Sequence, residues 1–123
     1  MQVTDFTLLL GSGNLERLAA FYERILELER LPSKHHVVFR IGGAKLRLIE
    51  HSEVGPRSPE PQRLQLNLFV ADVRAELERL QPFNVSVVRE PTQMAWGGWL
   101  VTLQDPDGNY VQLIEGSELT PPR

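Results

Sequence analysis

The chain has 123 residues, a length that favours one compact domain with its own hydrophobic core. Its 13 Lys and Arg residues face 16 Asp and Glu residues, and the net charge of −3 argues against binding to nucleic acid or to an anionic membrane. The absence of Cys excludes disulfides, thiolate metal ligands and a cysteine nucleophile. No apolar run approaches the roughly 20 residues of a membrane span, and no basic signal segment begins the chain. We therefore expect a cytoplasmic protein.

The first predicted elements are a strand and a helix. Residues 6–10 alternate between two sets of side chains and end at Gly11-Ser12-Gly13, which indicates a half-buried strand followed by a turn. Asn14 is a favourable N-cap residue. Apolar residues then recur every three or four positions as far as Leu26, a pattern typical of an amphipathic helix.

A hairpin and an irregular connection follow the helix. Residues 35–40 and 44–50 have strand character, and Gly42-Gly43 between them predicts a tight turn. Residues 51–63 contain three prolines among polar neighbours, so we expect no regular element there.

The second half of the chain repeats this plan. Asp72 can cap a helix that carries Val73, Leu77 and Leu80 on one face. Asp105-Pro106-Asp107-Gly108 is a strong turn signal. Strands are predicted at residues 65–70, 85–89, 99–103 and 109–115.

Short identities support an internal duplication. Residues 43–50 align with residues 108–115 at an offset of 65, and Thr7 aligns with Gln65 at an offset of 58. An insertion around residues 92–98 accounts for the difference. The predicted boundaries within one domain of residues 1–123 are 1–51 for module one, 52–63 for the connection and 64–116 for module two.

Alternation along the strands predicts two different sheet faces. One face carries Leu and Val and would be covered by a helix. The other face mixes polar, aromatic and charged side chains, which indicates either a sheet curved around a wet cavity or a plain exposed surface. Its members are Thr7, Leu9, Lys45, Arg47, Gln65, Asn67, Tyr110 and Gln112.

Two segments resemble signatures of a known family. Residues 14–26 resemble the first helix of the glyoxalase/bleomycin-resistance/dioxygenase superfamily, also called vicinal oxygen chelate proteins. Residues 96–98 and 103–115, with the Asp-Pro-Asp-Gly-Asn turn, are similar to its C-terminal signature. The resemblance implies an α+β fold: two βαβββ modules forming a cupped, partly closed mixed β-sheet with helices on the outside, commonly within a homodimer.

The resemblance also implies four inward strand positions that supply the ligands in metal-using members. These positions map to Thr7, Arg47, Gln65 and Gln112. A divalent metal prefers imidazole or carboxylate ligands, whereas Arg cannot ligate at all. At about 4 Å, Arg47 would repel a dication by several kcal/mol at an effective dielectric constant of about 20. We therefore expect no metal and no cofactor.

Three candidate residues leave alternatives open. Arg47 either holds an anionic or carbonyl-bearing ligand, or pairs with an acid or reaches solvent. His35 is predicted to point inward beside Val37 and Phe39, where it is either a general base or structural. Trp96 is either a lid over the ligand or a plug in the core or a dimer seam. No catalytic residue is assigned. The full set of predicted ligand-binding residues is Thr7, His35, Arg47, Gln65, Asn67, Trp96, Thr102, Tyr110 and Gln112.

Three functions follow as hypotheses. The first is a metal-independent small-molecule binding protein whose polar or anionic organic ligand lies near Arg47. The alternative is a lyase, isomerase or dioxygenase-type enzyme of the same superfamily that uses non-standard ligands such as His35. The third is a subunit that only assembles with partners. The expected partners are a small organic ligand and a second copy in a homodimer, with neither nucleic acid nor membrane.

Overall fold

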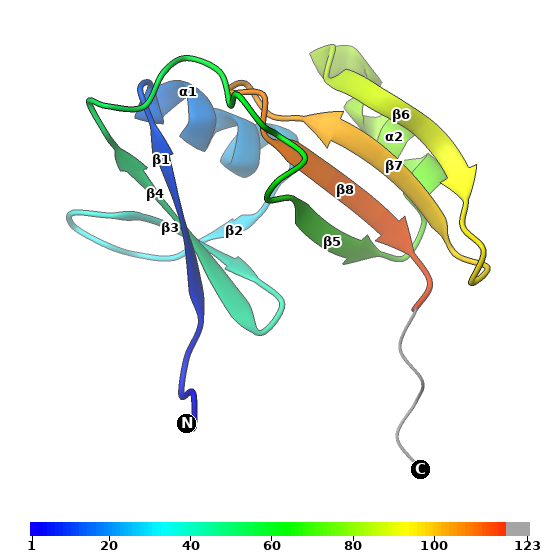
Figure 1. Cartoon of the computed structure of the whole chain (residues 1–123), viewed down its shortest axis with the longest axis horizontal. Helices are drawn as coiled ribbons and strands as arrows, with labels where there is room; N and C mark the ends of the chain where they lie inside the picture. Colours follow the sequence, from blue (N-terminus) through cyan, green and yellow to red (C-terminus); the bar gives the residue numbers. More distant parts are fainter. Residues whose placement is uncertain (118–123) are drawn as a thin grey trace. The chain divides into compact units, whose positions relative to one another are not determined.

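The computed structural model describes residues 1–117. The chain divides into two compact units, Met1–Ser58 and Pro59–Arg123 (Figure 1). Each unit contains one open four-stranded sheet and one principal helix. In the described part of the chain, no helix is long and apolar enough to cross a membrane.

The first unit has the order strand, helix and three strands. Its elements are β1 (Thr7–Ser12), α1 (Leu15–Ala20), β2 (Glu29–Arg30), β3 (Val37–Ile41) and β4 (Ala44–Glu50). The sheet order is β1-β4-β3-β2. The outer strand β1 runs parallel to β4, whereas the other neighbours are antiparallel, so the sheet is mixed.

Helix α1 begins where the sequence predicted it. The side chain of Asn14 accepts a hydrogen bond from the backbone N–H of Arg17 at 3.1 Å, which satisfies one free donor of the first turn. The helix continues as a π-helical turn over Phe21–Ile25. Tyr22, which is fully buried, lies 6.4 Å from Phe39 of β3 between ring centroids. Phe39 therefore belongs to the core between helix and sheet.

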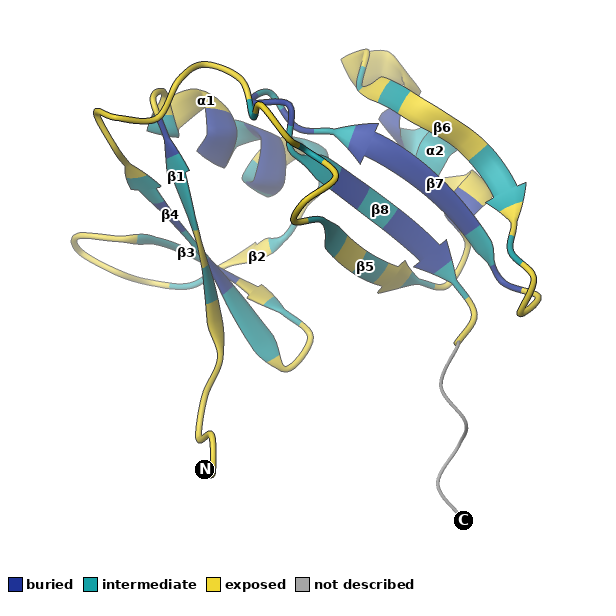
Figure 2. Cartoon of the chain, viewed as in Figure 1, coloured by how far each residue is buried: buried dark blue, intermediate teal, exposed yellow. Residues whose placement is uncertain are grey.

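The second unit repeats the first. Its elements are β5 (Leu66–Val70), α2 (Val73–Leu80), β6 (Ser86–Gln93), β7 (Trp99–Gln104) and β8 (Tyr110–Glu115), with a 3-10 turn at Gln81–Phe83. The sheet order is β5-β8-β7-β6, with β5 parallel to β8. Most of β7 and β8 is buried, whereas β6 is largely exposed (Figure 2).

Helix α2 is fixed at its first turn by two carboxylates. Asp72 accepts from the backbone N–H of Ala75 at 3.0 Å, and Glu115 of β8 accepts from that of Val73 at 2.9 Å. The guanidinium of Arg74 lies 4.7 Å from the centroid of the Trp99 ring. Glu115 and Trp99 therefore lie on the helix side of the sheet.

The turn before β8 is held by Asp105, which is buried at 3% exposure. One carboxylate oxygen accepts from the backbone N–H groups of Asp107 and Asn109, and the other accepts from the Asn109 side chain at 2.9 Å. The hydrogen bonds confirm turn chemistry for this segment.

The internal repeat is confirmed at the level of strand register. Leu9 pairs with Arg47 in the first unit, and Asn67 pairs with Gln112 in the second. These pairs are related by the offsets of 58 and 65 that the sequence shows. The expected α+β class with two βαβββ modules is likewise confirmed.

Candidate functional site

In the first unit, the sheet face opposite α1 carries the most informative side chain. Residues paired across neighbouring strands point to the same side of a sheet. Leu9 and Val38 both pair with Arg47, one from each neighbouring strand, so these three residues share one face. Leu46 and Leu48, which alternate with Arg47, are buried on the other face, which α1 covers.

Arg47 forms a hydrogen bond with a histidine on this face. Its Nη2 lies 2.9 Å from Nδ1 of His36 and 3.5 Å from Nε2 of the same ring. Because a guanidinium only donates, the imidazole nitrogen at 2.9 Å is the acceptor. The Nε atom of Arg47 is buried and has no hydrogen-bond partner among residues 1–117.

The predicted orientation of His35 is wrong. We expected it to share the inward face with Phe39, but Phe39 pairs with Leu46 and packs in the core. The offset is 65 between Arg47 and Gln112, yet it is 64 between their partners Val38 and Thr102. The turn of the second hairpin is thus one residue longer, and a one-residue slip exchanges the two faces of a strand. His36, not His35, lies beside Arg47. His35 is exposed, 6.5 Å from His36 between ring centroids.

Sequence analysis did not select His36 as a candidate residue. It applied the offset of strand β4 to strand β3, across a turn whose length differs between the modules. Counting Gly42-Gly43 against the longer turn after Asp105 would have corrected the alignment by one position. The signal was therefore present in the two turn sequences.

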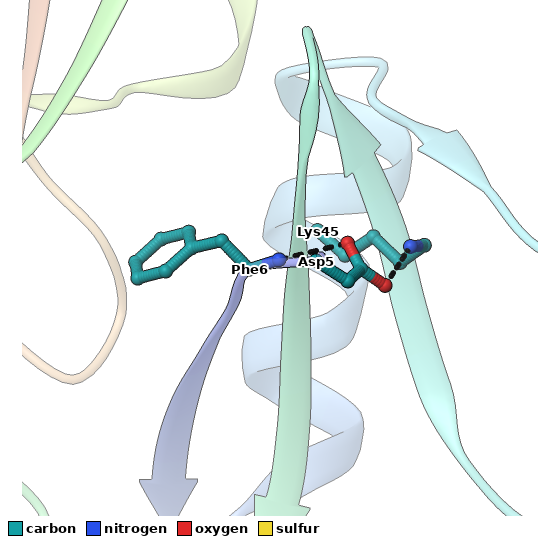
Figure 3. A network of polar contacts seen from close by, with 3 residues as sticks. All are labelled: Asp5, Phe6 and Lys45. Atoms are coloured by element: carbon teal, nitrogen blue, oxygen red, sulfur yellow. Dashed lines mark hydrogen bonds and ion pairs between the residues drawn. The ribbon is translucent and has the colours of Figure 1, made fainter. Parts of the chain in front are cut away.

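Lys45 lies on the same face but is already paired. Its Nζ is 2.6 Å from the Asp5 carboxylate, which also accepts from the backbone N–H of Phe6 at 2.8 Å (Figure 3). The hydrogen bond from Lys45 is the main cause that lowers the pKa of Asp5 from 3.8, with help from the Phe6 N–H and the charge of Lys45. Thr7, which pairs with Lys45 in register, is exposed.

In the second unit, the central side chains of the corresponding face are neutral, and Arg89 of β6 pairs with Thr102 at its margin. Gln112 pairs with Asn67 on one side and Thr102 on the other, and its Nε2 donates to the Thr102 hydroxyl at 3.4 Å. Tyr110 lies on β8 opposite Gln104. Gln65, just before β5, donates to the backbone oxygen of Gln62 at 3.0 Å, and its buried Oε1 has no partner among the described residues. The structure thus places Asn67, Thr102 and Gln112 in one row.

Trp96 lies in the turn between β6 and β7 and is 38% exposed. Its ring lies against Gly98, where an added Cβ atom would overlap it. The same ring approaches Gly116 after β8. The contacts hold Trp96 onto its own unit, and its role as a lid stays a prediction, as does the enclosure of one cup by the two modules.

The side chains at the four positions implied for a metal do not fit one. Thr7, Gln65 and Gln112 supply neutral oxygens at best, and Arg47 supplies a permanent positive charge. Within residues 1–117, no three His, Asp or Glu side chains gather in an arrangement suited to a metal ion. The donor chemistry of these positions suits a ligand that accepts hydrogen bonds.

Known structures share this fold. A lactoylglutathione lyase from Agrobacterium tumefaciens is 21% identical, with 94% of this chain and 96% of that chain covered and a TM-score of 0.71. TnmS3, an antibiotic binding protein from Streptomyces sp. CB03234, is 24% identical, with 95% and 99% covered and a TM-score of 0.74. A member of the Glyoxalase/bleomycin resistance protein/dioxygenase superfamily from Sphaerobacter thermophilus is 19% identical, with 94% and 98% covered and a TM-score of 0.74.

Sequence comparison gives the family. No curated protein matches the chain. A family model does match, over residues 6–113. This range contains both helices and every strand, except for the end of β8. With the two βαβββ modules in place, the conclusion is direct: the chain belongs to the Glyoxalase/Bleomycin resistance protein/Dioxygenase superfamily.

Proposed function

We propose that the chain is a metal-independent small-molecule binding protein whose polar or anionic ligand is held near Arg47. The observation that carries the proposal is the guanidinium itself, at a strand position where metal-using relatives are expected to keep a ligand. Arg47 has no carboxylate within ion-pair distance among residues 1–117, so its charge is available to a ligand.

The remaining predicted ligand-binding residues would contribute neutral hydrogen bonds and apolar contact. Gln112 and Thr102 are half-buried or buried polar groups, and the Oε1 of Gln65 is buried without a partner. A polar ligand can satisfy such groups, which are costly to leave unpaired. The proposed set is Thr7, Arg47, Gln65, Asn67, Trp96, Thr102, Tyr110 and Gln112. His35 is left out, because Phe39, with which it was expected to share the inward face, packs in the core.

Similarity to an antibiotic binding protein supports binding without turnover, and similarity to a lactoylglutathione lyase supports the enzyme alternative. The geometry favours binding. The unprotonated ring nitrogen of His36 already accepts a hydrogen bond from Arg47, so neither residue is available as a general base. Consumption of a bound compound during incubation would identify the lyase, isomerase or dioxygenase-type alternative.

The test is thermal unfolding with a panel of small aromatic carboxylates and their neutral amides, with and without EDTA. A ligand at 100 times its Kd stabilises the folded state by about 2.7 kcal/mol, and we expect this shift to persist in EDTA. The Arg47→Gln variant should lose at least about tenfold in affinity for carboxylates.

Arg57→Gln is the matched control, because it removes the same charge from an exposed site in the connection. It should bind like the original chain. Ligand stabilisation that disappears in EDTA, or that survives unchanged in Arg47→Gln, would contradict the proposal.

We further propose a cytoplasmic homodimer. A chain without Cys has no disulfide to lose in a reducing compartment. Strand β1 forms an edge of its sheet and carries exposed Leu9, with exposed Phe6 just before it, and such edges favour pairing with another chain. Sedimentation equilibrium should give twice the chain mass of 14.0 kDa, and a monomer at all concentrations would exclude the dimer.

A further inference from the structure

Arg47 and His36 together present hydrogen-bond donors only. A guanidinium has five N–H donors and no acceptor. Because Nη2 of Arg47 donates to Nδ1 of His36 at 2.9 Å, that ring nitrogen carries a lone pair. The neutral ring then has its proton on Nε2, which is a donor.

One of these donors lacks a partner. The Nε of Arg47 is buried and makes no hydrogen bond among residues 1–117. A buried donor without an acceptor costs free energy, and almost all such groups in folded proteins are satisfied. An acceptor brought by a ligand would satisfy it.

The charges on the sheet face that carries Arg47 also favour a ligand that brings a hydrogen-bond acceptor. Lys45 has Asp5 at 2.6 Å and Arg40 has Glu29 at 3.1 Å, so both neighbouring cations have carboxylate partners. In the described part of the chain, the only side chain hydrogen-bonded to Arg47 is His36, which is neutral in this arrangement. Arg47 therefore keeps its full positive charge for an incoming anion.

We propose that Arg47 and His36 form a two-residue site for an oxyanion group of the ligand, a carboxylate or a phosphate, with His36 as the second anchor. The inference rests on the proposed function and adds to it the ligand's chemical class and a residue that sequence analysis did not select. Arg47 Nε–H and its remaining N–H groups donate to the oxyanion. His36 Nε2–H adds a second, uncharged donor and keeps the guanidinium in place through Nδ1.

The experiment measures affinity by titration calorimetry in EDTA at neutral pH, with benzoate, benzamide and inorganic phosphate as probes. Benzoate and benzamide have nearly the same shape and differ in charge. The chain should bind benzoate at least about tenfold more tightly than benzamide, a difference of about 1.4 kcal/mol. Phosphate that competes with benzoate assigns a general oxyanion site, and phosphate that does not compete assigns a carboxylate site. Either result supports the proposal.

Variants of the two adjacent histidines test whether His36, and not His35, contributes to oxyanion binding. His36→Leu should weaken benzoate binding about tenfold and leave benzamide binding unchanged. His36→Asn, whose amide can both accept from Arg47 and donate to an anion, should retain benzoate affinity within about threefold. His35→Leu is the matched control and should bind like the original chain, because Arg47 forms its hydrogen bond with His36 and not with His35 in the described structure.

A second readout needs no ligand. Nitrogen NMR of the imidazole rings should find Nδ1 of His36 without a proton and Nε2 with one. The Arg47→Gln variant should lose this preference. A proton on Nδ1 of His36 in the neutral ring would contradict the proposed two-residue site, because Nδ1 could not then accept a hydrogen bond from Arg47.

The outcomes distinguish this inference from the proposed function. If Arg47→Gln weakens benzoate binding but both His36 variants bind normally, the second anchor is wrong and the proposed function stands. If none of these variants changes the affinity, both are wrong. Equal affinity for benzoate and benzamide overturns the oxyanion class while leaving a neutral ligand for the proposed function.

Discussion

Lys45 and Arg47, two cations on strand β4, have different side-chain partners. Lys45 forms an exposed ion pair with Asp5, a kind of contact that adds little to stability. Arg47 instead holds a neutral imidazole. The same strand therefore carries one cation with a carboxylate partner and one cation that has none among residues 1–117.

The Asp5 pair gives a prediction for pH. Because Lys45 and the Phe6 N–H stabilise the ionised carboxylate, the pKa of Asp5 lies below 3.8. The stability it contributes is complete above pH 3.8 and is lost as the pH falls through the lower folded value. Carbon NMR of the Asp5 carboxyl should show a midpoint below 3.8, and Lys45→Met should move it back toward 3.8. A midpoint unaffected by Lys45→Met would show that the ion pair is not formed in solution.

Gly98 gives a prediction for packing. A Cβ atom there would overlap the Trp96 ring and lie 2.5 Å from the backbone oxygen of Glu115. The ring can move, but the backbone of β8 cannot move without disturbing the sheet. Gly98→Ala should lower the free energy of unfolding by about 2 kcal/mol in urea. In Gly43→Ala the new methyl group meets no atom within 4 Å, so the stability should stay within about 0.5 kcal/mol.

At the scale of elements, the two modules use equivalent glutamates differently. Glu115 on β8 accepts from the backbone N–H of Val73 at the start of α2. Glu50 on β4 is its counterpart at an offset of 65, yet in the described structure its side chain makes no hydrogen bond to α1. Only the second module therefore ties its last strand to the first turn of its helix.

The matched substitution tests this difference. Glu115→Ala leaves a first-turn N–H without its acceptor and should lower the free energy of unfolding by about 1 to 2 kcal/mol. Glu50→Ala should change it by less than about 0.5 kcal/mol. Equal losses for the two variants in urea unfolding would show that the carboxylate does not act as a cap.

The same scale explains which elements the sequence predicted. Helix starts at Asn14 and Asp72 and the turn at Asp105 depend on local hydrogen bonds, so local patterns found them. Strand β6 extends to Gln93, beyond the predicted end at Arg89, because shifts in its register with β7 interrupt the alternation of its side chains. The sequence prediction placed His35 instead of His36 beside Arg47, because the turn of the second hairpin is one residue longer. Only a comparison of the two hairpin lengths reveals this difference.

At the scale of the whole molecule, most of the fold could be predicted from the internal duplication. Two copies of one pattern gave the module order and the faces of β1, β4, β5 and β8, since each copy checked the other. The partner of Arg47 could not be predicted in this way, because Arg47 and His36 have no like counterparts in module two, where Gln112 and Leu100 stand. Chemistry that differs between the copies has to be read from side-chain contacts.

The central claim is that a guanidinium, and not a metal ion, receives the ligand. The most direct measurement is a crystal structure of EDTA-treated protein grown with saturating benzoate and then with equimolar zinc and manganese. We predict the benzoate carboxylate within hydrogen-bond distance of Arg47 and His36. A divalent ion coordinated at Thr7, Gln65 or Gln112, with Arg47 turned away from it, would contradict the account.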